Sequence, residues 1–406
     1  MITTFFGGES FGGDAAYVDR LSRALLRAGH EVEVVHCADA FAALRGTHPL
    51  RPYEPPPGLR VHTLRSGLGR LSPLWTHQLG TPGPKRRAIR DLLGSGGFDV
   101  VHLHNVSLVG GPGLVAEVRD ATDAAVLLTA HDYWLVCPKS NLWRFERAPC
   151  VLPRCATCTL HARRPVQLWR YGEGLTRSLR ELDAVIVPSE ASARIHRERG
   201  IDVPLEVLPY FIPSDWAGPA GPGAPQSLER PLLVAASRLV PEKGLATLIA
   251  AMHRVPDVDL VIAGVGPSGG ELARLAARVG NARLVGLLGA RELATLYASA
   301  AAVVMPSLWL EPFGYVVLEA ASVGTPAVVR RRGALAELVE GTGGGLVYET
   351  DDELVGAIRA VVDAPELRAR LAERAREAAA GAWSERGHLE RYLALAREAA
   401  TRRRAA

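Results

Sequence analysis

The residues best suited to chemistry lie in the second half of the chain, where cations, glycines and carboxylates follow one another at short intervals. Arg238 and Lys243 stand five residues apart in the segment SRLVPEKG (237–244), which we expect to join a strand end to a helix start. Two cations beside a helix N-terminus, where free N–H groups and the helix dipole favour negative charge, suit a diphosphate. Only three of the 47 basic residues are lysines, so a lysine here indicates that a compact point charge is wanted.

A pair of glutamates forms the next group. Glu311 and Glu319 are eight residues apart, the first in an expected loop and the second about two turns into an expected helix. Glu319 could accept hydrogen bonds from two vicinal hydroxyls. The start of that helix offers free N–H groups to phosphate oxygens at Phe313, Gly314 and Tyr315.

Two glycine groups mark places where the backbone could approach a ligand closely. Gly264 and Gly266 follow an apolar run, and Gly12 and Gly13 precede the first helical pattern. The N-terminal glycines do not have the G-x-G-x-x-G spacing of a dinucleotide site, which argues against an oxidoreductase.

The order and spacing of these segments resemble those of the family 4 retaining glycosyltransferases, which have the GT-B fold. Their S-R-x-x-x-x-K-G segment, their E-P-F-G segment with seven residues between its acids, and a following G-T-P all occur here. In the first half, Gly12-Gly13 resembles the family's glycine loop. The segments DVVHLH (99–104) and Thr129-Ala130-His131-Asp132 resemble its two histidine-bearing strand ends. The likeness covers nearly the whole chain.

The resemblance implies a role for each of these residues. Arg238 and Lys243 would neutralise the diphosphate leaving group of a nucleotide sugar as the glycosidic bond breaks. Glu311 would hold sugar hydroxyls, Glu319 the ribose, and His131 with Asp132 would line the reacting face. The implied catalytic residues are His131, Asp132, Arg238, Lys243 and Glu311, and the implied donor-binding residues are Gly12, Gly13, Gly264, Gly266, Phe313, Gly314, Tyr315 and Glu319.

The activity implied is retaining transfer of a sugar from a nucleotide-diphosphate sugar to a hydroxyl acceptor without a catalytic metal. The acceptor could be a glycan, a lipid-linked molecule or a small molecule, as in polysaccharide or natural-product biosynthesis. The leaving phosphate would take the acceptor's proton. The alternatives are another GT-B enzyme, such as a sugar phosphorylase or a nucleotide-sugar epimerase, or a nonenzymatic sugar-nucleotide or metal-binding partner protein.

Two segments depart from the family pattern. Arg330-Arg331-Arg332-Gly333 replaces a loop of small residues before Glu337, and would favour an acidic sugar or an acceptor phosphate if it faced the donor. The alternative is an exposed basic turn. Tyr210-Phe211-Ile212-Pro213 replaces the usual N-G-[VI]-D at the end of the first half, which affects the hinge or the acceptor wall.

Four of the five cysteines cluster directly after His131-Asp132. Cys137, Cys150, Cys155 and Cys158 have the pattern C-x12-C-x4-C-x2-C in an irregular segment. Four thiolates could build a structural zinc site, with an iron–sulfur cluster as a weaker possibility and four reduced thiols as the alternative. The fifth, Cys37, is expected to be a small buried hydrophobic residue.

Strands alternate with helices along both halves, which predicts parallel, doubly wound sheets. Short apolar runs mark strands, and the first is Ile2–Phe6. The other expected strands are 31–36, 98–102, 125–130, 184–187, 232–236, 260–263, 284–285, 302–305 and 327–329.

The pattern predicts two Rossmann-like domains facing across a cleft. An acceptor-binding domain would span 1–212, with a Cys-rich insert at 137–165, and a Pro/Gly/Ala-rich linker would follow at 213–230. A nucleotide-sugar-binding domain would span 231–380. A C-terminal helix at 381–406 would pack back toward the first domain.

Composition restricts the class of protein. The 406 residues are 48% hydrophobic and 22% charged, as in globular proteins, and the net charge of +4 does not indicate a nucleic-acid binder. The N-terminus lacks a signal-peptide pattern, and no apolar run is long enough for a membrane span, so we expect a cytoplasmic protein. A peripheral membrane contact could use Lys85-Arg86-Arg87, Arg163-Arg164, Trp75, Trp143 and Trp169, the alternative being a solvated basic face.

Overall fold

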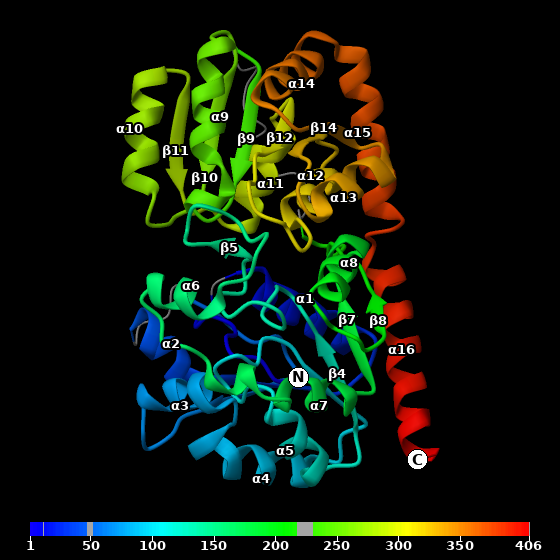
Figure 1. Cartoon of the computed structure of the whole chain (residues 1–406). Helices are drawn as coiled ribbons and strands as arrows, with labels where there is room; N and C mark the ends of the chain where they lie inside the picture. Colours follow the sequence, from blue (N-terminus) through cyan, green and yellow to red (C-terminus); the bar gives the residue numbers. More distant parts are fainter. Residues whose placement is uncertain (11, 47–51, 217–229, 406) are drawn as a thin grey trace.

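The computed structural model describes residues 1–10, 12–46, 52–216 and 230–405, and shows two α/β domains stacked end to end (Figure 1). Each domain is built around a parallel sheet. The doubly wound, two-domain α/β architecture predicted from the sequence is confirmed. Within the described residues, no helix is long and apolar enough to cross a membrane.

The C-terminal domain has a six-stranded sheet in the order β11-β10-β9-β12-β13-β14. Numbered along the domain, this is the 3-2-1-4-5-6 order of the Rossmann fold, with its topological switch point between β9 and β12. The strands are β9 (Leu232–Ala236), β10 (Asp259–Ala263), β11 (Ala282–Gly286), β12 (Ala302–Met305), β13 (Ala327–Arg330) and β14 (Gly345–Tyr348). The helices are η3 (Pro241–Lys243), α9 (Leu245–Ala251), η4 (Met252–Arg254), α10 (Gly269–Val279), α11 (Ala290–Ala298), α12 (Tyr315–Ser322), α13 (Ala334–Thr342), α14 (Asp351–Asp363) and α15 (Pro365–Ala380).

The N-terminal domain has the same kind of sheet, with its first strand reduced to a bridge. Ile2 pairs in parallel with Val35 on one side and Leu103 on the other, so that it joins β2-β1 to β3-β4-β7-β8. The strands are β1 (Val32–Cys37), β2 (Leu59–Leu64), β3 (Val100–Leu103), β4 (Ala125–Thr129), β7 (Ala184–Val187) and β8 (Leu205–Val207). The helices are α1 (Gly13–Arg27), α2 (Ala38–Arg45), α3 (Leu71–Leu79), η1 (Gly83–Lys85), α4 (Arg86–Gly96), α5 (Leu114–Ala121), α7 (Gly174–Arg180) and α8 (Glu190–Glu198).

A segment between β4 and β7 forms an irregular insert. It contains the hairpin β5 (Trp143–Arg144) and β6 (Ala148–Pro149), then α6 (Cys155–His161) and η2 (Leu168–Tyr171). The hairpin lies between the domains in Figure 1. Its Trp143 packs in a small apolar cluster with Trp309 of the C-terminal domain. The insert therefore joins the two domains beside the cleft.

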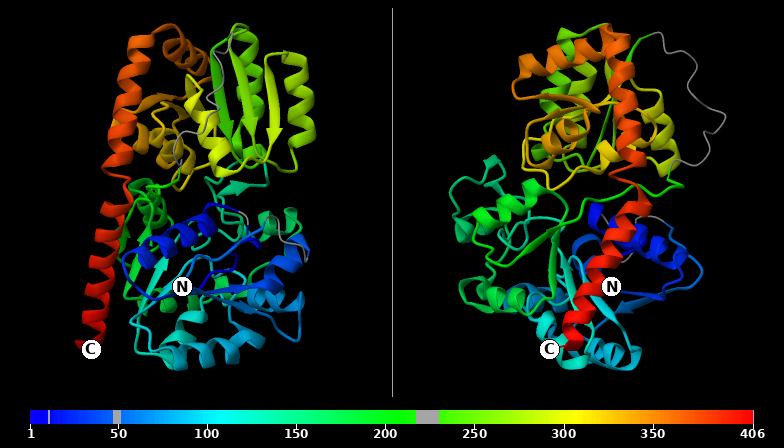
Figure 2. Two further views of the ribbon diagram at one scale, coloured as in Figure 1. Left: turned by 180° about the vertical axis from the view of Figure 1, so that it is seen from behind. Right: turned by 90° about the vertical axis from the view of Figure 1, so that its right-hand side faces the viewer.

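The chain passes between the domains at two adjoining places. Ile212 pairs in parallel with Ser384 and donates its N–H to the carbonyl of Trp383. Beyond that crossing, α16 (Glu385–Ala405) runs along the N-terminal domain, as Figure 1 and Figure 2 show. Its Tyr392 hydroxyl lies 3.1 Å from Nδ1 of His102.

Several local expectations were wrong. Ile2–Phe6 is not a continuous strand, because after Thr4 the chain leaves the sheet and turns, with Phe6 bridging Glu9. Strands β2, β8 and β14 have no counterpart among the expected strands. They are edge or short strands with partly exposed patterns, and so lack the continuous apolar run of a buried strand. Most of the expected linker, 217–229, lies outside the described residues.

Candidate functional site

The candidate site lies where the two switch points face each other. In the C-terminal domain, the loops after β9 and β12 carry Lys243 and Glu311. In the N-terminal domain, the glycine loop and the loop after β3 are joined by a 2.9 Å hydrogen bond from Asn105 to Asp14. Loops at the carboxyl ends of strands beside a switch point are the usual ligand site in such folds.

Lys243 and Glu311 form an ion pair between the two loops of the C-terminal domain. The Lys243 ammonium lies 2.6 Å from Oε1 of Glu311, with 13% and 6% of the side chains exposed. The Ser307 hydroxyl donates to the same oxygen at 2.5 Å. The ammonium also lies 4.9 Å from the ring centre of Trp309. The lysine is thus held in one position in a largely dry environment.

Arg238, in the same loop as Lys243, is exposed and has no ion-pair partner within the described parts of the chain. It lies near enough to Asp14 of the opposite domain to lower the pKa of that carboxyl, although burial is the larger effect and raises it. An unpaired guanidinium beside an anchored ammonium is an arrangement that can bind two phosphate groups.

The glycines after β10 are required by the packing of neighbouring loops. Gly264 has φ +135°, and a Cβ there would lie 1.9 Å from the carbonyl oxygen of Ser237. A Cβ on Gly266 would lie 2.4 Å from the carbonyl oxygen of Leu239. The backbone at these glycines therefore lies close to the loop that carries Arg238, and a larger residue would push that loop away.

The start of α12 meets the glycine loop of the other domain. Gly314 precedes the helix with φ +152°, and Phe313 is buried before it. The Tyr315 ring lies 3.3 Å from where a Cβ on Gly13 would stand. Tyr315 also stacks on Tyr210 at 4.9 Å between ring centres. Gly13 thus allows the aromatic ring to pack against the start of α1, and Gly12 gives the φ of +111° that turns the chain there.

Glu319 is paired with a residue of the opposite domain. Arg20 of α1 donates to Oε1 of Glu319 at 2.8 Å, and the two side chains are 12% and 11% exposed. The Arg20 guanidinium also lies 4.4 Å over the Tyr315 ring. Burial raises the pKa of Glu319, and Arg20 opposes that shift. One face of α1 thus ties the domains together at the carboxylate expected to hold a ribose.

His131 is half-buried, and both of its ring nitrogens have partners. Its Nε2 lies 3.0 Å from Nδ1 of His104, and its Nδ1 lies 2.5 Å from the Tyr210 hydroxyl. Burial lowers the pKa of His131 to about 3, so the ring is neutral at pH 7. Both nitrogens have partners, and therefore this histidine orients its neighbours and is not an acid at neutral pH.

Asp132 follows His131 directly, and its pKa is raised where that of His131 is lowered. Its Oδ1 accepts a 2.7 Å hydrogen bond from the backbone N–H of Trp134. Burial raises its pKa to about 7, and the nearby Asp14 carboxylate contributes to the rise. A cavity of about 20 Å³ lies against Asp132, His131, His104 and Asn105.

The basic loop after β13 packs against the Glu311 loop, since a Cβ on Gly333 would lie 2.2 Å from the carbonyl oxygen of Glu311 and the Ala334 N–H donates to that oxygen at 2.8 Å. Arg330 pairs with Asp351 at 2.8 Å, and Arg331 pairs with Glu340 at 2.6 Å. Only Arg332 is left without a carboxylate partner among the described residues. Acids of the same domain therefore neutralise two of the three charges in this run, and its contact with an acidic sugar or an acceptor phosphate stays a prediction. Glu337 caps α8 of the other domain through Glu190 and Ala191 N–H groups.

The four clustered cysteines lie in the insert, close enough together that three of them affect the pKa of the fourth, Cys155. Burial raises the pKa of Cys155, and the thiols of Cys137, Cys150 and Cys158 raise it further. The backbone N–H of Phe145 donates to Sγ of Cys158 at 3.3 Å. Across the described residues, however, no three His, Cys, Asp or Glu side chains are arranged to hold a metal ion. The sulfurs do not form a ligand set here, and the zinc site stays a prediction. Cys37 is buried.

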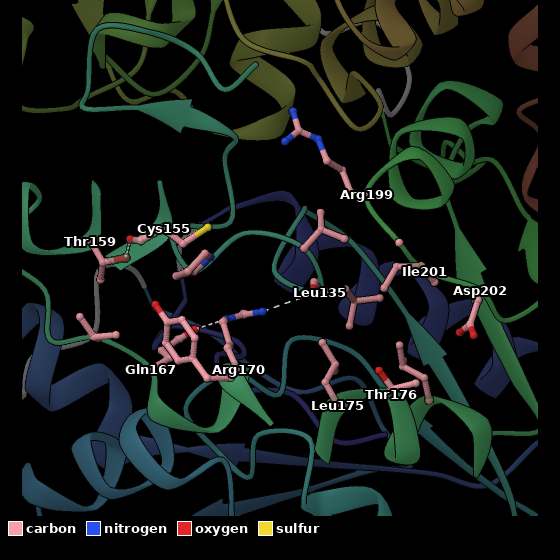
Figure 3. A pocket seen from close by; sticks show the side chains of 16 residues that line it. Leu135, Cys155, Thr159, Gln167, Arg170, Leu175, Thr176, Arg199, Ile201 and Asp202 are labelled. Atoms are coloured by element: carbon pink, nitrogen blue, oxygen red, sulfur yellow. Dashed lines mark hydrogen bonds between the residues drawn. The ribbon is translucent and has the colours of Figure 1, made fainter. Parts of the chain in front are cut away.

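A larger pocket, of about 270 Å³, lies under the insert and away from the donor loops (Figure 3). Arg170 points into it, and burial lowers the pKa of this guanidinium to about 10. Its donors are already used by the side chain of Gln167 and the carbonyl oxygens of Trp134 and Leu135. We therefore assign Arg170 to holding the loop after Asp132, and assign no ligand to the pocket.

Sequence reasoning missed Asp14, Arg20 and Trp309, and it named Tyr210 only as part of a segment affecting the hinge or the acceptor wall. Asp14 adjoins the glycine loop, so its position offered a weak signal. Arg20 and Trp309 gave no signal, because their partners are 299 and 66 residues away along the chain.

Comparison with known families matches both halves of the chain. A model described as "Glycosyltransferase Family 4" matches residues 11–216, and one described as "Glycosyl transferases group 1" matches residues 224–378. An MMP alpha-(1->4)-mannosyltransferase of Mycolicibacterium hassiacum is 29% identical over 92% of this chain and 91% of its own. A D-inositol 3-phosphate glycosyltransferase of Mycolicibacterium paratuberculosis is 35% identical over 55% of each chain.

Solved structures show the same fold. A sucrose-phosphate synthase from Thermosynechococcus elongatus superposes with a TM-score of 0.72, at 22% identity and 98% coverage of both chains. HepE of Anabaena, solved in complex with UDP-glucose, superposes with a TM-score of 0.64, at 18% identity and full coverage of both chains.

Proposed function

The chain belongs to glycosyltransferase family 4 and is a sugar-transferring enzyme of the GT-B fold, and from this premise we propose that it uses a nucleotide-diphosphate sugar and retains the anomeric configuration. The observation that carries the proposal is the Lys243–Glu311 pair at the switch point, with the unpaired Arg238 in the same loop. HepE, of the same fold, was solved with UDP-glucose, which supports this donor class.

The two cations of the β9 loop act on the leaving group. As the bond from the sugar C1 to the phosphate oxygen breaks, negative charge grows on the diphosphate. Lys243 is already fixed by Glu311, so it stabilises that charge without reorganising. Arg238 supplies the second charge and the bidentate geometry that suits phosphate. No catalytic metal is needed in this scheme.

The carboxylates act on the hydroxyls of the donor. Oε1 of Glu311 is occupied by Lys243 and Ser307, which leaves Oε2 for a sugar hydroxyl. Glu319 accepts hydrogen bonds from the ribose, and for this Arg20 must share or release its carboxylate. The N–H groups at the start of α12 bind phosphate oxygens.

The acceptor attacks from the side of the N-terminal domain. Its hydroxyl oxygen bonds to C1 on the face that the phosphate leaves, and its proton passes to the departing phosphate oxygen. Asp132 lies beside the cavity at this point and orients the hydroxyl. We place the reaction in the cytoplasm, with acceptors that include lipid-linked molecules at the inner membrane face. The cysteines in the structure are free thiols, as in a reducing compartment.

A panel of UDP-, GDP-, ADP- and dTDP-sugars tests the donor site by thermal stabilisation. A ligand at 100 times its dissociation constant should add about 2.7 kcal/mol. Glu319→Gln should weaken the shift, and the exposed Glu366→Gln, far from the cleft, should not. Transfer followed by NMR of the product anomer tests retention. No stabilisation by any donor, together with no transfer, would overturn the proposal, and inversion would overturn its stereochemistry.

A further inference from the structure

Helix α3 buries polar side chains and exposes apolar ones. Its core-facing side carries Ser72 and Thr76, both fully buried. The buried Lys85 ammonium lies 2.6 Å from the Ser72 hydroxyl and 3.3 Å from the Thr76 hydroxyl. Rotating the helix to bury its leucines would leave that ammonium without these partners, at a cost of several kcal/mol. The polar contacts therefore hold the apolar side of α3 toward solvent.

The outward side of α3 forms one apolar surface with η2. The two helices are in contact, since the Trp169 indole donates to the carbonyl of His77 at 3.0 Å. We call this surface the docking face. Its members are between 45% and 66% exposed, and they are Leu71, Leu74, Trp75, Leu79, Leu168 and Tyr171.

Exposed apolar side chains are concentrated in this part of the molecule. Of the 14 large hydrophobic residues exposed in the described parts of the chain, eleven lie within 44–79 and 151–171. The other three belong to the C-terminal domain. In Figure 1, α2, α3 and α6 lie along one edge of the N-terminal domain, opposite α16. Exposed apolar side chains gathered in one part of a molecule indicate an interaction site.

Basic residues flank the docking face, and some of them have no acidic partner within the described ranges. Segments 55–90 and 147–172 contain twelve Lys and Arg residues. Acids of neighbouring segments pair with several of these, namely Arg60, Arg65, Arg86, Arg87 and Arg90. Within these segments Arg70, Arg163 and Arg164 are exposed, and none has an ion pair with a described residue. Arg164 lies near enough to α3 to lower the pKa of His77.

We propose that the docking face binds the surface of an anionic lipid bilayer, with Leu71, Leu74 and Trp75 entering the acyl boundary and the unpaired arginines contacting lipid headgroups. An apolar stripe flanked by arginines fits this occupant, because the leucines bury apolar area while the guanidinium groups meet negative charge. The inference rests on the proposed function only for its purpose, which is to bring the cleft to a lipid-linked acceptor.

This surface differs from the one expected from the sequence. Lys85 and Trp143 are buried and cannot contact a membrane. Arg86 pairs with Glu117 at 2.6 Å, and Trp169 packs on Trp134. The proposed contact keeps Trp75, Arg163 and Arg164 from the expected set. It adds leucines of α3 that sequence pattern alone did not separate from core leucines.

Binding of the full chain to vesicles is measured by sedimentation, without donor or acceptor. One set of vesicles contains phosphatidylcholine alone, and the other contains phosphatidylcholine with 30% phosphatidylglycerol. We expect binding only to the second, weakened at high salt, with a blue shift of tryptophan fluorescence that Trp75→Phe removes. Arg163→Gln with Arg164→Gln should weaken binding by about 25-fold, since each basic residue near an anionic surface contributes about fivefold.

Leu71→Ser with Leu74→Ser should weaken binding by about tenfold or more. The matched controls lie on the C-terminal domain: Val265→Ser with Leu287→Ser, and Arg278→Gln with Arg291→Gln, all exposed. They should bind as the parent does, and thermal melting should show that every variant folds. Absence of vesicle binding by the parent overturns the proposal. An equal loss of vesicle binding in the control variants also overturns it, as does self-association through the docking face in place of vesicle binding. Transfer to a water-soluble acceptor is read separately, so a failure of lipid binding and a failure of the proposed activity are distinguishable.

Discussion

Lys243→Ala removes the ammonium that Glu311 holds at the switch point of the C-terminal domain. We expect its turnover number to fall by roughly 10²–10³, the size of losing one preorganised electrostatic contact with a developing negative charge. The structure supports the upper part of that range. The ammonium is fixed by a 2.6 Å ion pair and is largely shielded from water, so its field at a bound diphosphate is weakly screened.

The same substitution also has a stability cost that must be separated from catalysis. Without Lys243 the Glu311 carboxylate, which is 6% exposed, keeps the Ser307 hydroxyl as its one side-chain partner among the residues the structure describes. Leaving such a charge without its cation should lower the free energy of unfolding by about 1–3 kcal/mol or more. The double variant Lys243→Met with Glu311→Gln removes both charges and should recover part of that stability. It should not recover turnover.

The assay is turnover at saturating donor, with urea unfolding of each variant. Lys139→Ala is the matched control, because Lys139 is also a buried lysine, but it donates to the carbonyl of Trp143 in the insert. We expect that control to lose stability and to keep turnover within a few-fold. A Lys243→Ala enzyme that keeps turnover within threefold of the parent would refute the assignment of Lys243 to the leaving group.

Three further predictions follow from the site. Burial raises the pKa of Asp132 from 3.8 to about 7, so ionisation of this carboxyl opposes folding. The gain in unfolding free energy from Asp132→Asn should therefore grow from pH 4 to 7 and then level off. A gain that does not depend on pH in urea titrations would contradict this. Arg20→Gln should lower the free energy of unfolding by about 3 kcal/mol, and Arg20→Gln with Glu319→Gln should cost less than the two single changes together; strict additivity would show that the pair is uncoupled. Elemental analysis should find about one zinc per chain, lost in Cys155→Ser, while transfer activity survives EDTA; an active enzyme free of metal would leave four reduced thiols.

Local sequence predicted much of the fold because the strands of a doubly wound sheet are buried on both faces. Continuous apolar runs therefore marked β4, β7, β9 and β12 within a residue or two. The edge strand β2 failed this test, since its pattern of exposed and buried residues is mixed. Spacing also placed Lys243 between β9 and α9 and Glu319 in a helix, as the structure has them, while their roles toward a donor stay predictions.

The sequence by itself determined the family, the two parallel sheets and the loops that carry Arg238, Lys243 and Glu311. These depend on short-range order, which propensity and spacing record. Tertiary structure alone decided which charges are neutralised: Glu319 by Arg20 of the other domain, and Arg330 by Asp351. It also decided that α3 presents leucines to solvent, because Ser72 and Thr76 on its other side accept hydrogen bonds from the buried Lys85 ammonium. Such outcomes depend on partners far apart in the chain, whose meeting no local pattern encodes.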